Sequence, residues 1–526
     1  MTDDILMNVA EIFTRAMTLY PNRPALVVAG RTWSYEELGC VVAAASYKLK
    51  AAFENPGSCV TLPGESLDSE VFGGCQKETA PAAGGRIAII GGNNLSYIVA
   101  YWAAQFVGCS TVEIDGKESL QTLFGVLNAT RPQFVVTDRD DLKSAVQGKI
   151  HIESFEEFLT ECDNSRMSGE TPGKWLHRRF VYGCSDECSI VYTSGTTASA
   201  KGVILSHGNF CFVARTVADY LELNETDRCA LILPLCHTYG KSVLLSAAAA
   251  GAAIVILDGF GNRQRFLSRL TTERCTVLSA VPYHLHTLVK SGCLAQYDFS
   301  ALRVITSSAD KLSPSVIDSL AEALPEVRIF SMYGLTEATT RACYLPPEMI
   351  HAKKESCGRP LPSVELRIVL EDGRAAAPDE TGEVLLRGPN VMTGYLGDPD
   401  LTTATVIDSW LKTGDLGHLD ADGFLYIDGR KKDMIKCAGE RISPLEIEEI
   451  LMEHPGVGEA AVVGRLDSLM GEIIHAYVAP RNSPLKEADL REHCRARLTH
   501  NKVPYRYTIV EHLPRTNTGK IQKYQG

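Results

Sequence analysis

One stretch of this sequence combines small hydroxyl residues, glycines and a lysine in a way that suits phosphate binding. It spans residues 192–209, reads YTSGTTASAKGVILSHGN, and follows an apolar segment at 189–192 that is typical of a buried strand. Backbone N–H groups in such a loop can converge on phosphate oxygens, the hydroxyls add donors or metal ligands, and Lys201 adds positive charge. The spacing differs from the P-loop pattern G-x-x-x-x-G-K-S/T. Taken alone, the stretch is equally compatible with a nucleotide triphosphate site and with an ordinary turn.

Two carboxylates beside glycine turns could complete a nucleotide site. Glu337 ends the segment YGLTE, where a carboxylate could help to hold Mg²⁺ and Tyr333 could stack on a purine. Asp415 lies in KTGDLG, where it could accept hydrogen bonds from both ribose hydroxyls. For Glu337, a surface position explains the local sequence equally well, and for Asp415 a turn-forming role explains it somewhat better.

Basic residues in the last hundred positions could contact phosphate. Arg430, Lys431 and Lys432 are consecutive, and they could form either a solvated linker or a hinge with a ribose or phosphate contact. Lys520 lies in PRTNTGKI, on a glycine-containing turn that could carry its charge toward a developing phosphoryl group. Lysines near a chain end are usually solvated, so neither the basic run at 430–432 nor Lys520 predicts a phosphate contact by itself.

The elements that must position these residues follow an α/β pattern. From residue 86 onward, apolar strands alternate with helices, which predicts a parallel, doubly wound sheet. Ligands bind such sheets at the carboxyl ends of the strands. The phosphate-like stretch, His237, residues 307–310 and residues 333–337 all follow predicted strands, so we expect them around one cleft. Helices are predicted at 8–20, 96–107, 120–130, 210–220 and 241–250, and strands at 24–28, 31–35, 86–90, 110–114, 133–137, 252–257, 275–281 and 302–306.

Three other regions have a different character. Residues 51–85 are rich in Gly, Pro, Ser and acidic residues without an apolar period, which predicts an irregular surface insertion. Residues 360–430 alternate strand-like runs with Gly, Asp and Pro turns, which predicts a mostly antiparallel, barrel-like subdomain. Residues 431–526 read as a small α+β unit with helices at 444–453 and 485–498.

Composition narrows the class of protein. The chain has 526 residues, too many for one compact core, so two or more domains are expected. Its net charge of −12 argues against a nucleic acid or an anionic membrane as the main partner. No apolar run is long enough to span a bilayer, and the acidic N-terminus lacks a signal-peptide pattern. The 16 cysteines are scattered and contain no C-x-x-C, which is typical of reduced thiols in a cytoplasmic protein.

Six motifs occur in a fixed order along the chain, at 192–209, 333–337, 382–397, 413–430, 436–448 and 514–521. Together they resemble the signatures of the adenylate-forming superfamily, which includes acyl- and aryl-CoA synthetases, adenylation domains and luciferases. The resemblance implies a large N-terminal domain of two doubly wound sheets and a β-barrel over residues 1–430. It also implies a small, mobile α+β lid over residues 431–526, with its hinge near Lys432. The implied reaction forms an acyl-AMP from a carboxylic acid and Mg·ATP, releases pyrophosphate, and then transfers the acyl group to a thiol.

The resemblance also assigns roles to single residues. The phosphate loop would bind the β- and γ-phosphates, Thr336 would contact the α-phosphate, and Glu337 with Thr196 would help to hold Mg²⁺. Lys520 would serve adenylation alone, Gly439 would approach the pantetheine arm, and His237 would be the aromatic gate of the acyl pocket, although a packed core histidine is an alternative. The nucleotide set comprises Thr193, Ser194, Gly195, Thr196, Thr197 and Lys201 for phosphate, Ser308, Ala309, Asp310, Tyr333 and Gly334 for adenine, and Asp415 and Arg430 for ribose.

The sequence departs from the family pattern in two places and limits the substrate in a third. The loop has Ala198-Ser-Ala200 before Lys201, where the family commonly has a glycine and a proline, and the 51–85 insertion is unusually long. Amino-acid-activating members have an aspartate at the position of Thr238, so an α-amino acid is disfavoured. Tyr239 and Gly240 are expected to leave room for a chain or ring. Lys241 either reaches the pocket, to bind a second anionic or polar group, or is a solvated residue at the start of a helix.

The thiol acceptor is open at this point. Coenzyme A is the expected acceptor, and the phosphopantetheine of a separate acyl carrier protein is the alternative. A basic rim formed by Arg481, Lys486, Arg491, Arg495 and Arg497 could meet an acidic carrier, or could be a solvated helix face. A non-catalytic nucleotide-binding module is a remote third possibility, because Lys201, Glu337, Asp415 and Lys520 are all present.

Overall fold

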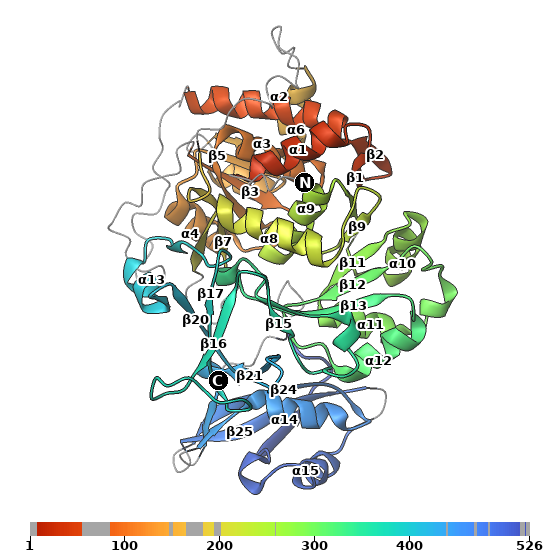
Figure 1. Cartoon of the computed structure of the whole chain (residues 1–526), viewed down its shortest axis with the longest axis vertical. Coiled ribbons are helices and arrows are strands. Elements are labelled where there is room, and N and C mark those ends of the chain that lie inside the picture. Colours follow the sequence, from red (N-terminus) through yellow and green to blue (C-terminus); the bar gives the residue numbers. More distant parts are fainter. Residues whose placement is uncertain are drawn as a thin grey trace. The chain divides into compact units, whose positions relative to one another are not determined.

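The chain folds into two compact units. The computed structural model describes residues 8–54, 85–146, 151–164, 182–193, 201–257, 259–437, 440–467, 471–481, 484–515 and 521 (Figure 1). The first unit comprises residues 1–354, 360–365 and 387–411, and the second comprises residues 355–359, 366–386 and 412–526. By this division, residues of the predicted barrel-like region fall in both units, and the predicted domain boundary at residue 430 stays a prediction. A hinge near Lys432 stays a prediction.

A nine-stranded sheet forms one half of the first unit within the described residues. Its central strands run parallel, and antiparallel strands close both edges. The carboxyl ends of the central strands therefore meet at one edge of the sheet. In spatial order the strands are β15 (Arg359–Pro360), β14 (Cys343–Leu345), β13 (Arg328–Tyr333), β12 (Val304–Ser307), β11 (Val277–Ala280), β9 (Arg228–Leu231), β10 (Ala253–Ile256), β1 (Pro24–Val28) and β2 (Arg31–Ser34).

A seven-stranded sheet forms the other half, and it carries the phosphate-like stretch. Strand β7 lies inside this sheet, parallel to β4, and turns back into the antiparallel strand β8 with Tyr192 opposite Gly202. The strand pairing therefore brings Tyr192 and Gly202, at the two ends of the phosphate-like segment, opposite each other. The order is β18 (Gly394–Tyr395), β8 (Gly202–Ser206), β7 (Glu187–Tyr192), β4 (Ser110–Asp115), β3 (Arg86–Gly91), β5 (Phe134–Thr137) and β6 (His151–Glu153).

Helices cover these sheets, and their ends follow local capping. The Asn8 side chain accepts a hydrogen bond from the Glu11 N–H at 3.2 Å, which starts α1 where the sequence predicted a helix. The helix predicted at 210–220 begins earlier, at His207, because Ser206 and Asn209 cap it reciprocally. The helices of this unit are α1 (Val9–Leu19), α2 (Tyr35–Glu54), α3 (Leu95–Val107), α4 (Leu120–Thr130), α5 (Asp140–Ala145), α6 (Phe155–Asn164), α8 (His207–Tyr220), α9 (Thr238–Ala250), α10 (Arg263–Thr272), α11 (Pro282–Ser291), α12 (Pro314–Ala323) and α13 (Pro399–Thr405).

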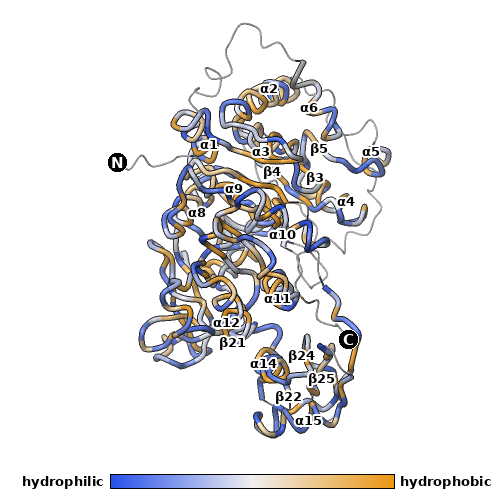
Figure 2. Tube along the Cα trace, turned by 90° about the vertical axis from the view of Figure 1, so that its right-hand side faces the viewer, coloured by the Kyte–Doolittle hydropathy of each residue, from blue (hydrophilic) through white to orange (hydrophobic). Residues whose placement is uncertain are grey.

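The apolar content of the strands explains the layering of the first unit. Residues Ile87, Ala88, Ile89 and Ile90 of β3 are all fully buried, as expected for a parallel strand covered on both faces. Figure 2 shows apolar segments in the sheets and in helices such as α3 and α9, whose residues are almost all buried. In the described part of the chain, no helix is both long and apolar enough to cross a membrane.

The second unit contains a small α+β fold and most of an antiparallel sheet, of which residues 406–411 belong to the first unit. One sheet has β16 (Glu365–Val369), β17 (Gly382–Arg387), β20 (Trp410–Leu419) and β19 (Val406–Ile407), with β21 (Leu425–Arg430) paired to β20. A second sheet packs against α14 (Pro444–Glu453) and α15 (Glu487–Arg495) around a core that includes Ile447, Val462, Ile474 and Leu490. Its strands are β23 (Glu440–Ile442), β22 (Ile435–Cys437), β25 (Gly471–Pro480) and β24 (Val457–Asp467), with β26 (Arg506–Ile509) beside β25.

Candidate active site

The carboxyl edge of the nine-stranded sheet carries four buried polar atoms without a hydrogen-bond partner. They are His237 Nε2 after β9, His284 Nδ1 after β11, Ser307 Oγ at the end of β12, and Arg341 Nε between β13 and β14. Buried polar groups in folded proteins are nearly always paired, so each exception needs an explanation. Unpaired buried atoms also occur away from this edge, for example at Tyr97 and Ser110, so it is the position of the four at the ligand-binding edge of a parallel sheet that makes them candidates for ligand contacts.

His237 lies at the start of α9, in a loop that Asn93 holds in place. The Asn93 side chain donates to the Leu233 carbonyl and accepts from the Leu235 N–H, both at 2.9 Å. Burial lowers the pKa of His237, and nearby Asp115 acts in the opposite direction, so the ring is neutral at neutral pH. One ligand atom each of Asp115, Cys236 and His237 lies within 4.8 Å of the others. This trio includes a thiol and does not suit Mg²⁺, which prefers oxygen ligands.

Tyr239 and Gly240 serve packing in this structure. The Tyr239 hydroxyl shares a 2.9 Å hydrogen bond with Thr306 Oγ1, which fixes the first turn of α9 against β12. A Cβ on Gly240 would come within 2.3 Å of the Pro234 carbonyl oxygen. Close approach of the preceding loop therefore requires glycine here, and the expectation that Tyr239 and Gly240 leave room for a substrate stays a prediction.

Lys241 is buried in an ion pair. Its Nζ lies 2.6 Å from Glu113 Oε1 and 2.6 Å from Ser189 Oγ, and its side chain is 2% exposed. Ser189 also donates to Glu113 Oε2 at 2.6 Å, and Thr111 donates to Glu113 Oε1 at 2.8 Å. The network joins α9 to β4 and β7. Lys241 therefore does not face solvent, so the solvated alternative is wrong, and a contact with a second polar group of the substrate stays a prediction.

Lys201 and Glu337 meet at a tyrosine. The Tyr395 hydroxyl donates to Glu337 Oε1 at 3.0 Å, and Lys201 Nζ lies 5.3 Å from the centre of the Tyr395 ring. Burial raises the pKa of Tyr395, and the Glu337 charge raises it further, so the hydroxyl stays a donor. Thr193 donates its N–H to the Lys201 carbonyl at 3.1 Å, which closes the base of the phosphate loop. The residues expected to bind phosphate between these two, Ser194, Gly195, Thr196 and Thr197, lie outside the described residues.

Glu337 fits a role in holding Mg²⁺. It lies in a short 3-10 helix (Thr336–Ala338), and its half-buried carboxylate is an oxygen donor beside the base of the phosphate loop. Mg²⁺ is typically bound by one or two carboxylates together with phosphate oxygens and water. The donor set is therefore compatible with the metal. The sequence did not single out Tyr395, although the motif at 382–397 contains it.

The residues expected around adenine lie at neighbouring strand ends. Tyr333 ends β13, and Ser308 to Asp310 directly follow β12, where Ala309 has a positive φ of 81°. A Cβ on Gly334 would approach the Thr340 carbonyl oxygen to 2.0 Å, so this turn requires glycine. Because β12 and β13 are adjacent and parallel, the fold brings these segments to the same edge, as predicted.

The ribose pair forms in the second unit. Asp415 lies opposite Arg430 in the β20–β21 register, and its Oδ1 is 2.8 Å from Arg430 Nε. The carboxylate is nearly buried and the guanidinium is partly exposed. Lys432 is exposed in the short helix Lys431–Asp433. Lys520 and Gly439 lie outside the described residues, so their roles stay predictions.

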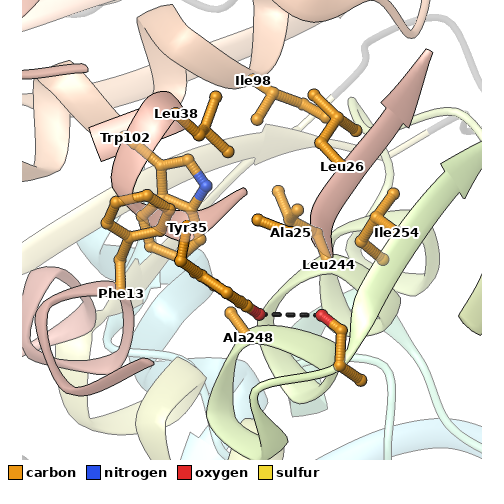
Figure 3. A pocket seen from close by; sticks show the side chains of 11 residues that line it. Phe13, Ala25, Leu26, Tyr35, Leu38, Ile98, Trp102, Leu244, Ala248 and Ile254 are labelled. Carbon is orange, nitrogen blue, oxygen red and sulfur yellow. Dashed lines mark hydrogen bonds between the residues drawn. The ribbon is translucent and has the colours of Figure 1, made fainter. Parts of the chain in front are cut away.

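A cavity beneath the N-terminal hairpin is not a substrate site. It lies among Phe13, Tyr35, Trp102 and Leu244, and the Tyr35 hydroxyl donates to the Ala252 carbonyl at 2.8 Å (Figure 3). Its volume is about 10 Å³, and its lining is almost entirely apolar. Such a space barely admits one water and offers it few partners.

Comparisons with known proteins agree with the geometry. An "AMP-binding enzyme" family model matches residues 82–396, and its C-terminal domain model matches residues 446–520. An indoleacetate–CoA ligase from Aromatoleum aromaticum is 38% identical over 336 residues, which is 64% of this chain and 65% of that protein. A 2-succinylbenzoate–CoA ligase from Bacillus velezensis is 33% identical over 445 residues, 84% of this chain and 87% of that protein.

Solved structures extend the similarity to the whole fold. The o-succinylbenzoate CoA synthetase from Bacillus subtilis, in complex with its acyl-adenylate intermediate, has a TM-score of 0.81 at 27% identity, covering 98% of this chain and 97% of that one. An anthranilate CoA ligase bound to anthranoyl-AMP shares the fold, with a TM-score of 0.84 at 23% identity and coverage of 99% and 97%. The chain belongs to the AMP-binding enzyme family of the adenylate-forming superfamily, and it is an AMP-forming acid–thiol ligase.

Proposed function

We propose that the protein activates an aromatic carboxylic acid with ATP and transfers the acyl group to coenzyme A. The observation that carries this proposal is the meeting of Lys201 and Glu337 at Tyr395, beside the base of the phosphate loop. The acid class rests on the relatives, which are named for indoleacetate and 2-succinylbenzoate. It also rests on the buried Thr238, which offers no charge to an α-ammonium group.

The reaction has two balanced steps. A carboxylate oxygen of the acid attacks the α-phosphorus of ATP, the bond to the β-phosphate oxygen breaks, and acyl-AMP and pyrophosphate form. The thiolate of coenzyme A then attacks the acyl carbon, and the carbon–oxygen bond to AMP breaks. Mg²⁺, when bound, offsets the phosphate charge. Lys201 and the loop hold the pyrophosphate end, Thr336 contacts the α-phosphate, and Lys520 bridges the attacking carboxylate and the α-phosphate during the first step alone.

Pyrophosphate exchange over a panel of aromatic, aliphatic and amino acids tests the first step. We expect acid-dependent exchange with aromatic acids, and we expect Lys520→Ala to abolish it while sparing thioester formation from supplied acyl-AMP. Lys523→Ala, a second lysine of the same tail, serves as the matched control and should leave exchange unchanged. Exchange that survives Lys520→Ala would overturn the role of Lys520. If none of the acids in the panel supported exchange, the proposed function would be overturned.

Coenzyme A is favoured over a carrier protein because the basic rim is partly neutralised. Arg491 pairs with Glu487 at 2.6 Å and Arg497 pairs with Glu453 at 3.2 Å, so two of its five cations already have carboxylate partners. Thioester formation measured with coenzyme A and with holo-carrier proteins decides between the acceptors. Faster transfer to a carrier protein would contradict the assignment.

We place the protein in the cytoplasm. Thirteen described cysteines are free thiols, and Cys40 and Cys184 are exposed among them. Exposed free thiols are typical of a reducing compartment. Fractionation of cells that express the full chain tests this placement, and recovery of the activity outside the cytoplasmic fraction would contradict it.

A further inference from the structure

Arg341 is a buried cation without a carboxylate partner among the described residues. Its side chain is among the largest fully buried ones, with the residue 1% exposed. Its Nε has no acceptor, and its contact with the Thr340 carbonyl is long, at 3.4 Å. A guanidinium cannot lose its proton in a protein, and burying an unpaired charge is costly. Lys241 is equally buried in the same unit, but Glu113 compensates it at 2.6 Å.

The surroundings of Arg341 place it at the ligand edge of the sheet. Its guanidinium carbon lies 4.3 Å from the centre of the Tyr239 ring, and Tyr239 is two residues from His237. The Tyr239 hydroxyl is fixed by Thr306, the residue before the unpaired Ser307 Oγ. Arg341 therefore belongs to the same edge as the other unpaired polar atoms.

Aromatic groups compensate the charge only in part. Burial raises the pKa of Tyr220 to about 12, and the positive charge of Arg341 acts in the opposite direction. The guanidinium thus has a hydrogen bond with the Tyr220 hydroxyl and a cation–π contact with the Tyr239 ring, and both tyrosines stay neutral. A cation–π contact offsets a fraction of the lost hydration and leaves the Nε donor unused. An anionic group on a bound ligand would supply the negative charge and the hydrogen-bond acceptor that the fold does not provide to Arg341.

We propose that Arg341 binds a second carboxylate of the acid substrate, at the end of the molecule away from the carboxylate that becomes adenylated. This inference rests on the proposed function and narrows its substrate to an aromatic dicarboxylic acid. The planar guanidinium matches a carboxylate in a bidentate pair, which provides both charge and geometry. The sequence could not single out Arg341, because it reads as a turn residue after YGLTE.

A comparison of each aromatic dicarboxylic acid with its half-ester tests the proposal on the unmodified enzyme. The methyl ester at the second carboxyl keeps the shape of the acid and removes its charge. We expect kcat/KM for pyrophosphate exchange to be at least about tenfold higher for the diacid. Equal values for the two would overturn the subsite while leaving the ligase function intact, and activity on neither would overturn the proposed function instead.

Variants of Arg341 separate a substrate subsite from a nucleotide contact. Arg341→Met should lose at least about tenfold in kcat/KM on the diacid and stay within about twofold on the half-ester, with KM for ATP unchanged. The kcat/KM of Arg341→Lys on the diacid should lie between those of the wild type and Arg341→Met, because lysine keeps the positive charge but cannot form a bidentate pair. An equal loss on both acids, or a raised KM for ATP, would overturn the assignment in favour of a phosphate or structural contact. Arg328→Met is the matched control, since Arg328 lies on β13 in a partly exposed pair with Glu222 at 3.0 Å.

Thermal stability gives a readout that does not depend on turnover. Because Arg341 is an uncompensated buried charge, Arg341→Met should raise the Tm of the ligand-free protein. The diacid should raise the Tm of the wild type more than the half-ester does, and this difference should vanish in Arg341→Met. A variant with a lowered Tm would show that the cation stabilises the fold by itself, and this would overturn the proposal.

Discussion

Two buried sets of polar groups in the first unit differ in whether their polar atoms have hydrogen-bond or ion-pair partners. In the seven-stranded sheet, Glu113 and Ser189 each lie 2.6 Å from Lys241 Nζ, and Thr111 and Ser189 donate in turn to the Glu113 carboxylate. At the carboxyl edge of the nine-stranded sheet, His237, His284, Ser307 and Arg341 keep polar atoms without partners. The satisfied set joins α9 to β4 and β7, whereas the unsatisfied set keeps polar atoms that a ligand could pair with.

The largest expected effect comes from breaking the satisfied set. Lys241→Met or Glu113→Leu alone should lower the free energy of unfolding by about 3–5 kcal/mol, because each leaves the other member of the buried ion pair without its partner. The double variant Glu113→Leu with Lys241→Met should lie closer to the wild type than either single change. Urea unfolding of the four proteins measures the coupling, and additive losses would contradict the interpretation.

Glu337 should show the reverse behaviour, with a large effect on activity and a small one on folding. Glu337→Gln should slow pyrophosphate exchange about 100-fold, because a group that holds charge in the transition state is lost. Its free energy of unfolding should change by less than about 1 kcal/mol. Exposed Glu348 in the short helix Pro347–Met349 provides the control, and an equal loss in Glu348→Gln would argue against a specific role.

Low pH should weaken the native state through buried histidines. Burial lowers the pKa of His284 from 6.5 to about 4. The unfolded chain therefore binds the proton first as the pH falls, so stability is complete above 6.5 and is lost between 6.5 and about 4. The loss should be on the order of 2 kcal/mol, and His284→Leu should reduce it. Exposed His500→Ala is the control, and identical pH slopes for wild type and His284→Leu would refute the expectation.

The smallest effect should come from Tyr395→Phe. The change removes the hydroxyl that donates to Glu337 and keeps the ring beside Lys201. One hydrogen bond to a charged group contributes about 1.5 kcal/mol, so exchange should fall by about tenfold. Tyr505→Phe, at a tyrosine that is 49% exposed, should leave the rate unchanged. A loss as large as that of Glu337→Gln would mean that Tyr395 does more than orient the carboxylate.

Local patterns in the sequence predicted most of the elements. The helix at 120–130 coincides with α4 (Leu120–Thr130), and Asn8 caps α1 as its side chain allows. Strand β8 was missed because glycine and serine residues at its ends conceal a short strand inside a loop-like stretch. The tertiary pairing of β8 with β7 and β18 overrides its local composition.

Long-range partners could not be predicted from the sequence. Lys241 follows the gate position closely enough to suggest a pocket residue. Its actual environment is set by an ion pair with Glu113, which lies on a strand far away in the sequence. The order of motifs led correctly to the family, because it reflects a shared site and not single contacts. Arg341 escaped attention because burial without a counter-ion is a property of the fold alone.

The hairpin of β7 and β8 bears on how this protein can change over evolutionary time. Both ends of the phosphate segment are anchored by strand pairing, with Tyr192 opposite Gly202. The entropy of closing a loop grows slowly with its length, by about 0.6 kcal/mol for each doubling. A change in the number of residues between these two anchors therefore costs the fold little. Selection can then act on the length of the segment mainly through its effect on turnover.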